Sequence, residues 1–572
     1  YTFDYHKTLL FHSNKKMSEE QSIKLDIGII GGGCSGLVTL KELVTEGHRC
    51  TVFEKSNSIG GLYRLAYQEG IFVSSHLLTM FSDFVGNDDT ILEKPRMLSF
   101  SEYTKYLEDY AEHFQLIEFI KCNSEVQSLS KDKSMNKWKI RLTNGDTHFF
   151  DRIAICTGVF GNISMPIFEN QDLFQGKIRH LKEVKAYEEF RDKNVCIIGS
   201  GESASDMILA AAQLGKKAIL SIRNDHGFIV PRYIHGDRYG PADLDTSRVH
   251  HSIPRAFGVL HTYMDMYNSL IKSYLKMWLF QKGQSTNFDL VRREGIRMNL
   301  KQIKTSNVWT TFGTKNANLV EALVLHKDKC QRKPGIKKLT SNSIIFEDDS
   351  EEIVDEIICC TGFRNSFPFI EFSDEADDNL KRIANEAKIS HNLYKHCIHP
   401  ELNDEIFWIG FARPALGAIP PLMELQARWI ALLCSKKLTL PNKSQMIEQI
   451  TKYVKYLEWQ LTPYRVNRLT GLTDYLIYSD DLARTIGCRP NFTRIFFQQP
   501  KLWLKLMCGP LINAQYRLTG PHAKPKQAKE ILLRAKWVKQ PNVLYFIMLI
   551  CYAFFWLVFG IESCKPAAWY PM

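Results

Sequence analysis

Two glycine-rich segments have the residue types and the spacing that suit phosphate binding. The first is Gly31-Gly32-Gly33-Cys34-Ser35-Gly36, and the second is Gly199-Ser200-Gly201-Glu202-Ser203-Ala204. Each follows a short apolar run and precedes a run of helical character. In such a turn, glycines let the backbone approach a pyrophosphate, which then lies at the positive end of a helix. Both segments are therefore predicted to bind dinucleotides.

The elements around the first segment occur in the order of a dinucleotide-binding fold. Residues 27–30 predict a strand, residues 37–45 predict a helix, and residues 50–53 predict a second strand that ends at Glu54. An acid about 20 residues beyond the glycines is placed to accept hydrogen bonds from ribose hydroxyls. The alternative is a structural turn between strand and helix that binds no nucleotide.

Each glycine of the first segment has a separate expected role. Gly31 permits the tight turn after the strand, Gly33 lets a pyrophosphate approach the backbone, and Gly36 allows close contact between helix and strand. The negative pyrophosphate would lie at the first turn of the helix, where free N–H groups and the helix dipole favour an anion.

The second segment ends in alanine and is followed by a cation. Gly199, Gly201 and Ala204 form a G-x-G-x-x-A pattern, which is compatible with NADP. Arg223 follows the predicted strand 218–222, at the point where a site for NAD would place an acid. A guanidinium there can bind a 2′-phosphate through paired, charge-assisted hydrogen bonds. The pattern favours NADPH over NADH, and a solvated surface arginine is the alternative.

The composition is that of a globular protein with several domains. The chain has 572 residues, of which 45% are hydrophobic and 24% are charged. The net charge of +11 is spread along the chain without a compact basic block, which argues against nucleic-acid binding. The 14 cysteines include no C-x-x-C pair and have no histidine cluster at ligand spacing, so we expect no metal site. Nothing in the sequence indicates an oligomeric state.

Four blocks in a fixed order resemble the flavin-containing monooxygenase family. The blocks are E-K-S-N…I-G-G-L-Y-R at 54–64, Y-L…Y-A…F at 106–114, F-Q-G-K-I-R-H at 174–180, and L-G-A-I-P-P…E-L-Q-A-R-W at 416–429. Together with the two glycine turns they cover residues 26 to 440. The resemblance implies that the first turn binds FAD and that the second binds NADPH.

The resemblance also implies which residues contact the cofactors. The expected FAD contacts are Gly31, Gly33, Cys34, Ser35, Gly36, Glu54, Lys55, Gly61, Leu62, Tyr63 and Gln426. The expected NADP contacts are Gly199, Ser200, Gly201, Glu202, Ser203, Ala204 and Arg223. In the implied reaction, NADPH reduces FAD, a C4a-hydroperoxyflavin forms with O2, and a soft nitrogen or sulfur nucleophile of a small molecule takes one oxygen atom. The cofactor supplies the bond-making chemistry, so no catalytic nucleophile is expected.

One position on the flavin side departs from the family pattern. Counting back from F-S-D-F at 81–84 places Val73 where the family usually has asparagine. Valine offers no hydrogen bond to a bound cofactor or oxygen intermediate. Ser74, Ser75 and His76 are the neighbouring polar residues and the candidates to replace the amide.

Three alternatives to N- or S-oxygenation remain open. The valine motivates an uncoupled NADPH oxidase or a Baeyer–Villiger oxygenase, although Val184 stands after the third block where Baeyer–Villiger relatives carry tryptophan. The third alternative, from another class, is a membrane-attached sensor that binds FAD without turnover.

We therefore expect an α/β protein with two Rossmann-like dinucleotide-binding domains, the FAD domain being discontinuous. The expected segments are a disordered leader at 1–25, the first part of the FAD domain at 26–165, the NADPH domain with an insertion at 166–335, the second part of the FAD domain at 336–440, a C-terminal helical region at 441–540, and a transmembrane anchor at 541–561.

The anchor prediction depends on an unbroken apolar run at 543–559. With its flanks the run reaches the roughly 20 residues that cross a bilayer. Basic residues are more frequent upstream than downstream, so the catalytic body is expected in the cytosol, on the endoplasmic reticulum membrane. A buried core helix or an interfacial hairpin is the alternative.

Overall fold

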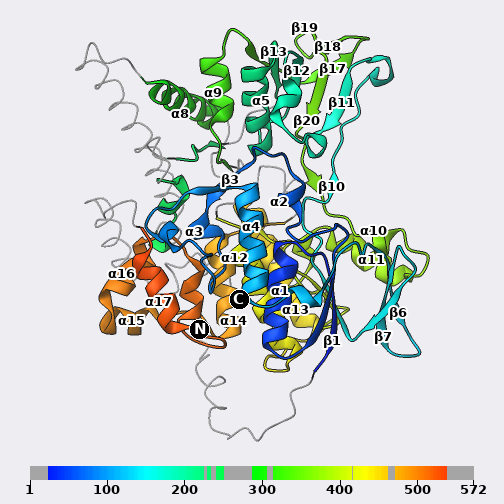
Figure 1. Cartoon of the computed structure of the whole chain (residues 1–572), viewed down its shortest axis with the longest axis vertical. Coiled ribbons are helices and arrows are strands. Elements are labelled where there is room, and N and C mark those ends of the chain that lie inside the picture. Colours follow the sequence, from blue (N-terminus) through cyan, green and yellow to red (C-terminus); the bar gives the residue numbers. More distant parts are fainter. Residues whose placement is uncertain are drawn as a thin grey trace, which may run out of the picture.

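A computed structural model of the chain describes residues 24–223, 228–233, 240–249, 286–305, 313–414, 417–461 and 471–536. Two bodies, each built around a parallel five-stranded sheet, lie one above the other (Figure 1). The predicted α/β class with two Rossmann-like sheets is confirmed.

The first sheet carries the first glycine turn. Its strands lie in the order β22-β9-β1-β2-β5, with the bounds Ile406–Trp408, Arg152–Ile155, Asp26–Ile30, Arg49–Phe53 and Ile120–Lys121. Helices α1 (Cys34–Thr45) and α12 (Pro420–Cys434) cover one face. The other face packs on an antiparallel sheet of β6 (Val126–Asp132), β7 (Lys137–Leu142) and β8 (Thr147–Phe150). Because both faces are covered, the central strand reads as a continuous apolar run.

The second sheet repeats this layered design around the second glycine turn. Its parallel strands lie in the order β11-β20-β12-β13-β16, with the bounds Lys177–His180, Glu356–Cys359, Asn194–Ile198, Lys217–Ser221 and Cys330–Lys333. Helices α5 (Glu202–Leu214) and α9 (Asn318–Leu325) pack on one face, and α8 (Asn287–Thr305) lies beside α9 (Figure 1).

The return from the second body to the first comes later than expected. The sequence prediction placed it at residue 336. In the structure, β17 (Ile336–Leu339), β18 (Ser343–Phe346) and β19 (Glu351–Ile353) cover the second sheet, and β20 is one of its strands. The first sheet resumes only at β22. A buried parallel strand has the same apolar pattern in either sheet, so the pattern of residues 356–359 did not assign it to one of them.

A group of shorter elements packs on the core of the first body, and part of it faces the second body. It contains α2 (Leu62–Leu65), β3 (Ile71–Ser75), α3 (His76–Thr79), β4 (Met97–Ser99) and α4 (Phe100–His113). Helix α4 begins with a capping box, in which Ser99 and Glu102 each bond the backbone N–H of the other. These elements place residues 71–76 against the second body (Figure 1).

Helices follow the first sheet, as predicted for residues 441–540. They are α13 (Lys443–Leu461), α14 (Tyr475–Ile486), α15 (Phe492–Gln498), α16 (Pro500–Cys508) and α17 (Pro525–Arg534). Buried side chains from most of these helices join those of α1 and α12 in one hydrophobic core. The C-terminal helices are thus an integral part of the first body.

Several predicted segments lie outside the described residues. These are the leader up to residue 23, part of the insertion in the NADPH domain, and the anchor at 541–561. Among the residues that are described, no helix is long and apolar enough to cross a membrane.

Candidate functional site

The first turn leaves the start of α1 open to an anion. Gly33 is the N-cap of α1 and makes no side-chain hydrogen bond to the N–H groups of the first helical turn. Gly31 has a φ of +109°, a conformation that favours glycine. A Cβ atom added at Gly36 would lie 1.9 Å from the carbonyl oxygen of Gly31. The turn is therefore closed by contacts that only glycines permit, and its N–H groups can receive a phosphate.

Glu54 fixes this turn from the neighbouring strand. Its Oε2 accepts a hydrogen bond from the N–H of Gly32 at 2.7 Å, and its Oε1 accepts one from the N–H of Ser56 at 2.9 Å. The residue is only 6% exposed. A carboxylate has about four acceptor positions, so the group retains capacity for a ribose hydroxyl.

The other predicted FAD residues surround the turn in different ways. Cys34 and Ser35 are buried in the first turn of α1, and Ser35 Oγ donates to the carbonyl of Cys156 at 3.2 Å. Gly61 opposes Gly33, because a Cβ added at Gly61 would lie 3.1 Å from the Gly33 Cα. Only the backbones of these residues face the place of a pyrophosphate.

Lys55, Leu62 and Tyr63 are the more peripheral of the predicted contacts. Lys55 is exposed, and Leu62 begins the short helix α2. The ring of Tyr63 packs on Phe72 and Tyr103, at centroid distances of 4.8 and 4.9 Å. This packing holds the loop that carries Gly61 against the first turn.

Gln426 is fully buried in α12, and both ends of its amide are bound by the protein. Its Oε1 accepts from the N–H of Gly410 at 2.9 Å, and its Nε2 donates to Tyr478 Oη at 2.7 Å. A Cβ added at Gly410 would lie 3.0 Å from the Ser35 Cβ. Gln426 thus positions the loop after β22 against the start of α1, and a direct contact with FAD stays a prediction.

The second turn has the same construction. Gly199 has a φ of +118°, and a Cβ added there would lie 2.8 Å from the carbonyl oxygen of Cys360. Gly201 is the N-cap of α5 without a side-chain hydrogen bond, and a Cβ added there would meet nothing within 4 Å. Ala204 is buried, whereas Ser200 and Ser203 are half-buried. This turn also offers free N–H groups at the start of a helix.

Arg223 lies beside the second turn. The N–H of Gly199 donates to the carbonyl of Ser221 at 3.1 Å, which places the end of β13 next to the turn. Arg223 follows two residues later and is exposed. Its Cγ lies close to Gly335, where an added Cβ would approach it to 2.9 Å. The guanidinium is therefore at the edge where a 2′-phosphate is expected.

The flavin-side residues 73–76 form the end of β3 and the start of α3. Val73 is half-buried, and Ser74 and Ser75 are buried. His76 is also buried, and its Nε2 lies 2.7 Å from the carbonyl oxygen of Val85. Burial lowers the pKa of His76 to about 4, so its imidazole is neutral near pH 7.

Sequence reasoning missed the side chains that join the two bodies. Asp206 in α5 accepts hydrogen bonds from Tyr67 Oη at 2.9 Å and from Arg232 at 3.0 Å. The side-chain amides of Asn316 and Asn318 also donate to it, at 2.8 and 2.9 Å. Tyr67 belongs to the first body and the other residues to the second. No local pattern marks such a contact, because its members come from distant segments.

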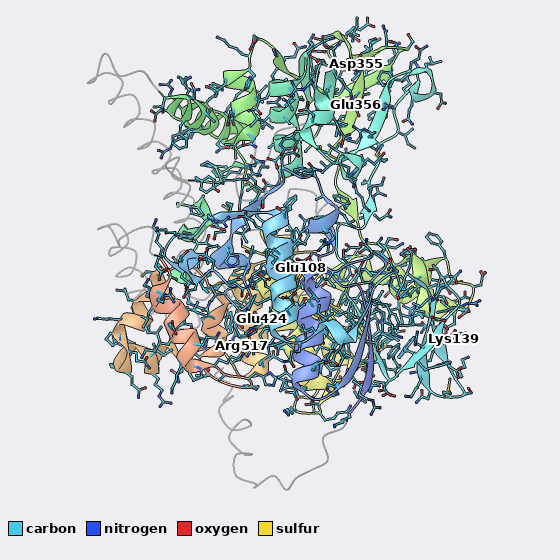
Figure 2. The ribbon with its side chains drawn as sticks, in the orientation of Figure 1. Glu108, Lys139, Asp355, Glu356, Glu424 and Arg517 are labelled. Carbon is cyan, nitrogen blue, oxygen red and sulfur yellow. The ribbon has the colours of Figure 1, made fainter. Side chains whose placement is uncertain are left out.

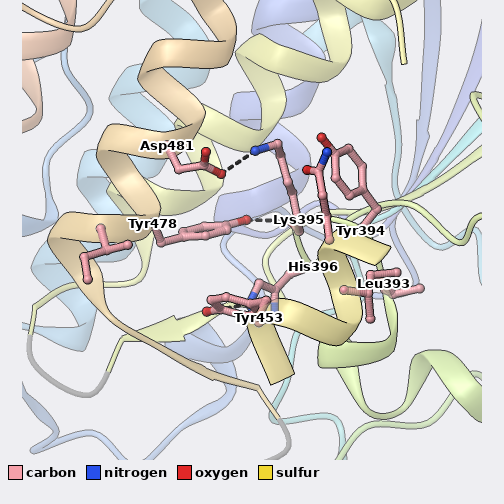
Figure 3. Close-up of a pocket in the computed structure, with 10 residues that line it drawn as sticks. Leu393, Tyr394, Lys395, His396, Tyr453, Tyr478 and Asp481 are labelled. Atoms are coloured by element: carbon pink, nitrogen blue, oxygen red, sulfur yellow. Dashed lines mark hydrogen bonds and ion pairs between the residues drawn. The ribbon is translucent and has the colours of Figure 1, made fainter. Parts of the chain in front are cut away.

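A small pocket beneath α14 is separate from both turns (Figure 3). It has a volume of about 40 Å³ and is lined in part by His396, Tyr453 and Tyr478. Lys395 forms an ion pair with Asp481 at its edge. The volume suffices for a few water molecules and not for a cofactor or an aromatic substrate.

Sequence comparisons cover nearly the whole chain. The family model described as flavin-binding monooxygenase-like matches residues 24–544. A 4-hydroxybenzoate brominase (decarboxylating) of Pseudoalteromonas luteoviolacea is 30% identical over 538 residues, which cover 91% of this chain and 95% of the relative. Flavin-containing monooxygenase 5 of Homo sapiens is 30% identical over 539 residues, which cover 91% of this chain and 93% of the relative.

Solved structures share the fold at lower identity. The S-allyl-L-cysteine S-oxygenase from Allium sativum has a TM-score of 0.56 at 22% identity, covering 89% of this chain and 99% of that one. An epsilon-caprolactone-bound cyclohexanone monooxygenase has a TM-score of 0.55 at 15% identity, covering 81% and 97%. The architecture described above is thus shared along almost the full length of these proteins.

Proposed function

Because the chain belongs to the flavin-binding monooxygenase-like family, we propose that it oxygenates a soft nitrogen or sulfur atom of a small molecule. It is a flavin-dependent monooxygenase that uses FAD and NADP. The observation that carries the proposal is the pair of uncapped, glycine-lined helix starts, one at the end of each parallel sheet. One turn suits each dinucleotide, and the contacts around Asp206 hold the two bodies together.

The chain's own residues have binding and positioning roles in this reaction. The first turn and Glu54 would hold the pyrophosphate and a ribose of FAD, and the second turn with Arg223 would hold NADP. Bound FAD supplies the oxygen-transfer chemistry. The layer of β3, α3 and α4 excludes water from the flavin side, since its side chains are largely buried.

A substrate panel tests the proposal. Tertiary amines, sulfides and ketones are each supplied with NADPH and O2, and products and peroxide are measured per NADPH consumed. We expect N-oxides or sulfoxides in near-stoichiometric yield for at least one compound. Esters from ketones would favour Baeyer–Villiger chemistry instead. Peroxide alone with every compound would favour the uncoupled oxidase that Val73 suggests, and no flavin bleaching with NADPH would favour a sensor.

The panel also includes 4-hydroxybenzoate with bromide. A relative that is 30% identical over 91% of this chain is named as a decarboxylating brominase of this compound. Bromide, like a sulfide, is a soft nucleophile that can accept an oxygen atom. A brominated aromatic product that forms only with bromide would indicate that a halide, rather than organic sulfur or nitrogen, accepts the oxygen atom.

Arg223→Ala is expected to weaken NADPH binding and to leave NADH binding unchanged. Hydrogen bonds to a charged group contribute about 1.5–3 kcal/mol, so the apparent KM for NADPH should rise on the order of 10- to 100-fold. Steady-state NADPH and NADH oxidation at fixed O2 measures both values. Arg191→Ala, an exposed arginine of the same body that pairs with Glu188, is the matched control and should change neither. An equal rise for NADPH and NADH would contradict the 2′-phosphate role.

Membrane attachment is also part of the proposal. The apolar run at 543–559 and the basic residues before it support an anchor at 541–561 on the endoplasmic reticulum, with the two sheets in the cytosol. In cell fractionation, the full chain should stay in membranes after alkaline extraction, and a chain ending at residue 540 should be released. Release of both would contradict the anchor.

A further inference from the structure

One buried carboxyl group beside β3 has an oxygen for which the described residues provide no hydrogen-bond partner. Asp243 lies in the short helix η6 (Ala242–Asp245) and is 4% exposed. Its Oδ2 accepts a hydrogen bond from the backbone N–H of Ser75 at 2.6 Å. Its Oδ1 has no hydrogen-bond partner among the described residues. A buried acceptor left unpaired costs about 1–3 kcal/mol, so this atom is suited to a donor that the described part of the chain does not provide.

The hydrogen bond fixes where that oxygen lies. Ser75 ends β3, next to the residues predicted to face the flavin, and η6 packs on the core of the first body through Leu244. The N–H of Ala242 in η6 donates to the carbonyl of Arg232, whose side chain binds Asp206 of the second body. The carboxyl of Asp243 is held beside β3 by a backbone donor that no side-chain substitution removes. Such a donor restricts the carboxyl to one orientation, with Oδ2 toward β3 and Oδ1 free.

Burial, and not the surrounding charge, favours a bound proton on Asp243. Burial raises the pKa of Asp243 above its ordinary value, and Lys315 only partly opposes this effect. No ion pair joins the two residues among the described contacts. On the β3 side, His76 is neutral near pH 7 because burial lowers its pKa. Arg232 forms an ion pair with Asp206, and its charge also lowers the pKa of Glu202.

A second carboxyl group lies next to Lys315. Glu202 begins α5 in the second glycine turn, and its Oε1 accepts a hydrogen bond from the N–H of Lys315 at 2.6 Å. Its Oε2 is buried and has no hydrogen-bond partner within the part of the chain that the structure describes. Burial raises the pKa of Glu202 to about 7. Burial therefore raises the pKa of both acids, and the charge of Lys315 opposes this effect at each of them.

We propose that Asp243 is a catalytic residue that holds a proton on Oδ1 and delivers it at the flavin side of the site. The inference rests on the proposed function, whose balance is NADPH, O2, substrate and one proton giving NADP+, water and oxygenated substrate. One proton per cycle must therefore reach a buried site. The O–H bond of Asp243 breaks, a new O–H bond forms on the oxygen that leaves as water, and the carboxylate regains a proton from solution.

The first test observes the proton itself and needs no substrate. Infrared difference spectra of the FAD-bound protein are recorded over a pH titration. The wild type should show the carbonyl band of a protonated carboxyl group at pH values where an ordinary aspartate is ionised. Asp243→Asn should lose that band, and Asp348→Asn, which removes an exposed carboxylate of the second body, should keep it. A band unchanged in Asp243→Asn overturns the inference.

The second test follows single turnovers. Asp243→Asn should be reduced by NADPH at the wild-type rate, while substrate oxygenation in the reoxidation phase slows on the order of 100-fold and loses its pH dependence. Asp243→Glu keeps an acid and should recover part of the rate. If Asp243→Asn does not fold, Asp243→Glu is used in the infrared test instead. The carboxyl band of Asp243→Glu should shift rather than disappear. A normal oxygenation rate in Asp243→Asn overturns the inference.

These outcomes separate the inference from the function on which it rests. Failure of the proposed function appears in the wild type as absent oxygenation with every compound. Failure of the inference appears as unchanged infrared and kinetic behaviour in Asp243→Asn beside an active wild type.

Discussion

Gly36→Ala is expected to abolish FAD binding. The new Cβ would lie 1.9 Å from the carbonyl oxygen of Gly31, which is less than the distance of any non-bonded contact. The clash is relieved only if the end of β1 and the first turn of α1 move apart by more than 1 Å. The N–H groups of the turn then no longer converge on one pyrophosphate. The molar ratio of FAD to protein, measured by flavin absorbance, should be about one in the purified wild type and near zero in the variant.

A second glycine of the same body serves as the control. A Cβ added at Gly161 would meet nothing within 4 Å, and its φ does not lie in the left-handed region. Gly161→Ala should therefore keep its flavin and its melting temperature. Stoichiometric FAD in Gly36→Ala, with an unchanged melting temperature, would contradict the close packing described for the first turn.

Short-range features of the site were predictable from the sequence. Both glycine turns, the strands before them and the acid at residue 54 follow local rules of backbone conformation and helix-start electrostatics, and the structure places them as expected. The helices begin earlier than predicted, at Cys34 and Glu202 rather than after the turns. The reason is that the small residues of the turn already form the first helical turn.

Long-range features were not predictable from local patterns. Asp243 reaches Ser75 across 168 positions, and Gln426 positions Gly410 from another element. Tertiary packing brings these residues together, and neither segment has a sequence pattern that indicates the contact. The same reason explains why strand β20 could not be assigned to the second sheet from its sequence.

The largest group of long-range contacts that the sequence pattern did not predict is a buried ionic cluster in the first body. Arg517 follows α16 in the chain, is 0% exposed, and forms ion pairs with Glu42 of α1 and Glu424 of α12, at 2.5 and 2.9 Å. Figure 2 shows Glu424 and Arg517 close together in the lower body. Asp83 joins them and also pairs with Lys41 at 2.7 Å. The cluster connects the C-terminal helices to the helix that starts at the FAD turn.

The carboxyl groups of the cluster stay ionised because the neighbouring cations lower their pKa values. Burial alone would raise the pKa of Glu42, yet Arg517 and Lys41 hold it well below its ordinary value. The same two cations hold the pKa of Asp83 at about 2 against the effect of burial. Depressed acid pKa values stabilise the fold above the unfolded-state pKa near 4, and this contribution is lost as pH falls toward 2.

Arg517→Met is therefore expected to lower the free energy of unfolding by about 3–5 kcal/mol at pH 7, because it leaves buried carboxylates without their main cation. Denaturation in urea, followed by helix content and by FAD release, measures the loss, and both signals should move together since α1 carries Glu42. Without Arg517 the carboxylates take up protons more readily, so the deficit should narrow between pH 7 and pH 4.

The exposed residue Arg494 of α15 provides the matched control for this cluster. Arg494→Met removes a guanidinium of the same C-terminal region and should change stability by no more than about 0.5 kcal/mol. A deficit in Arg517→Met that stays constant from pH 7 to pH 4 would mean that lost packing, rather than unpaired charge, is its cause. Equal stability of the two variants would mean that the C-terminal helices do not depend on this cluster for their attachment to α1.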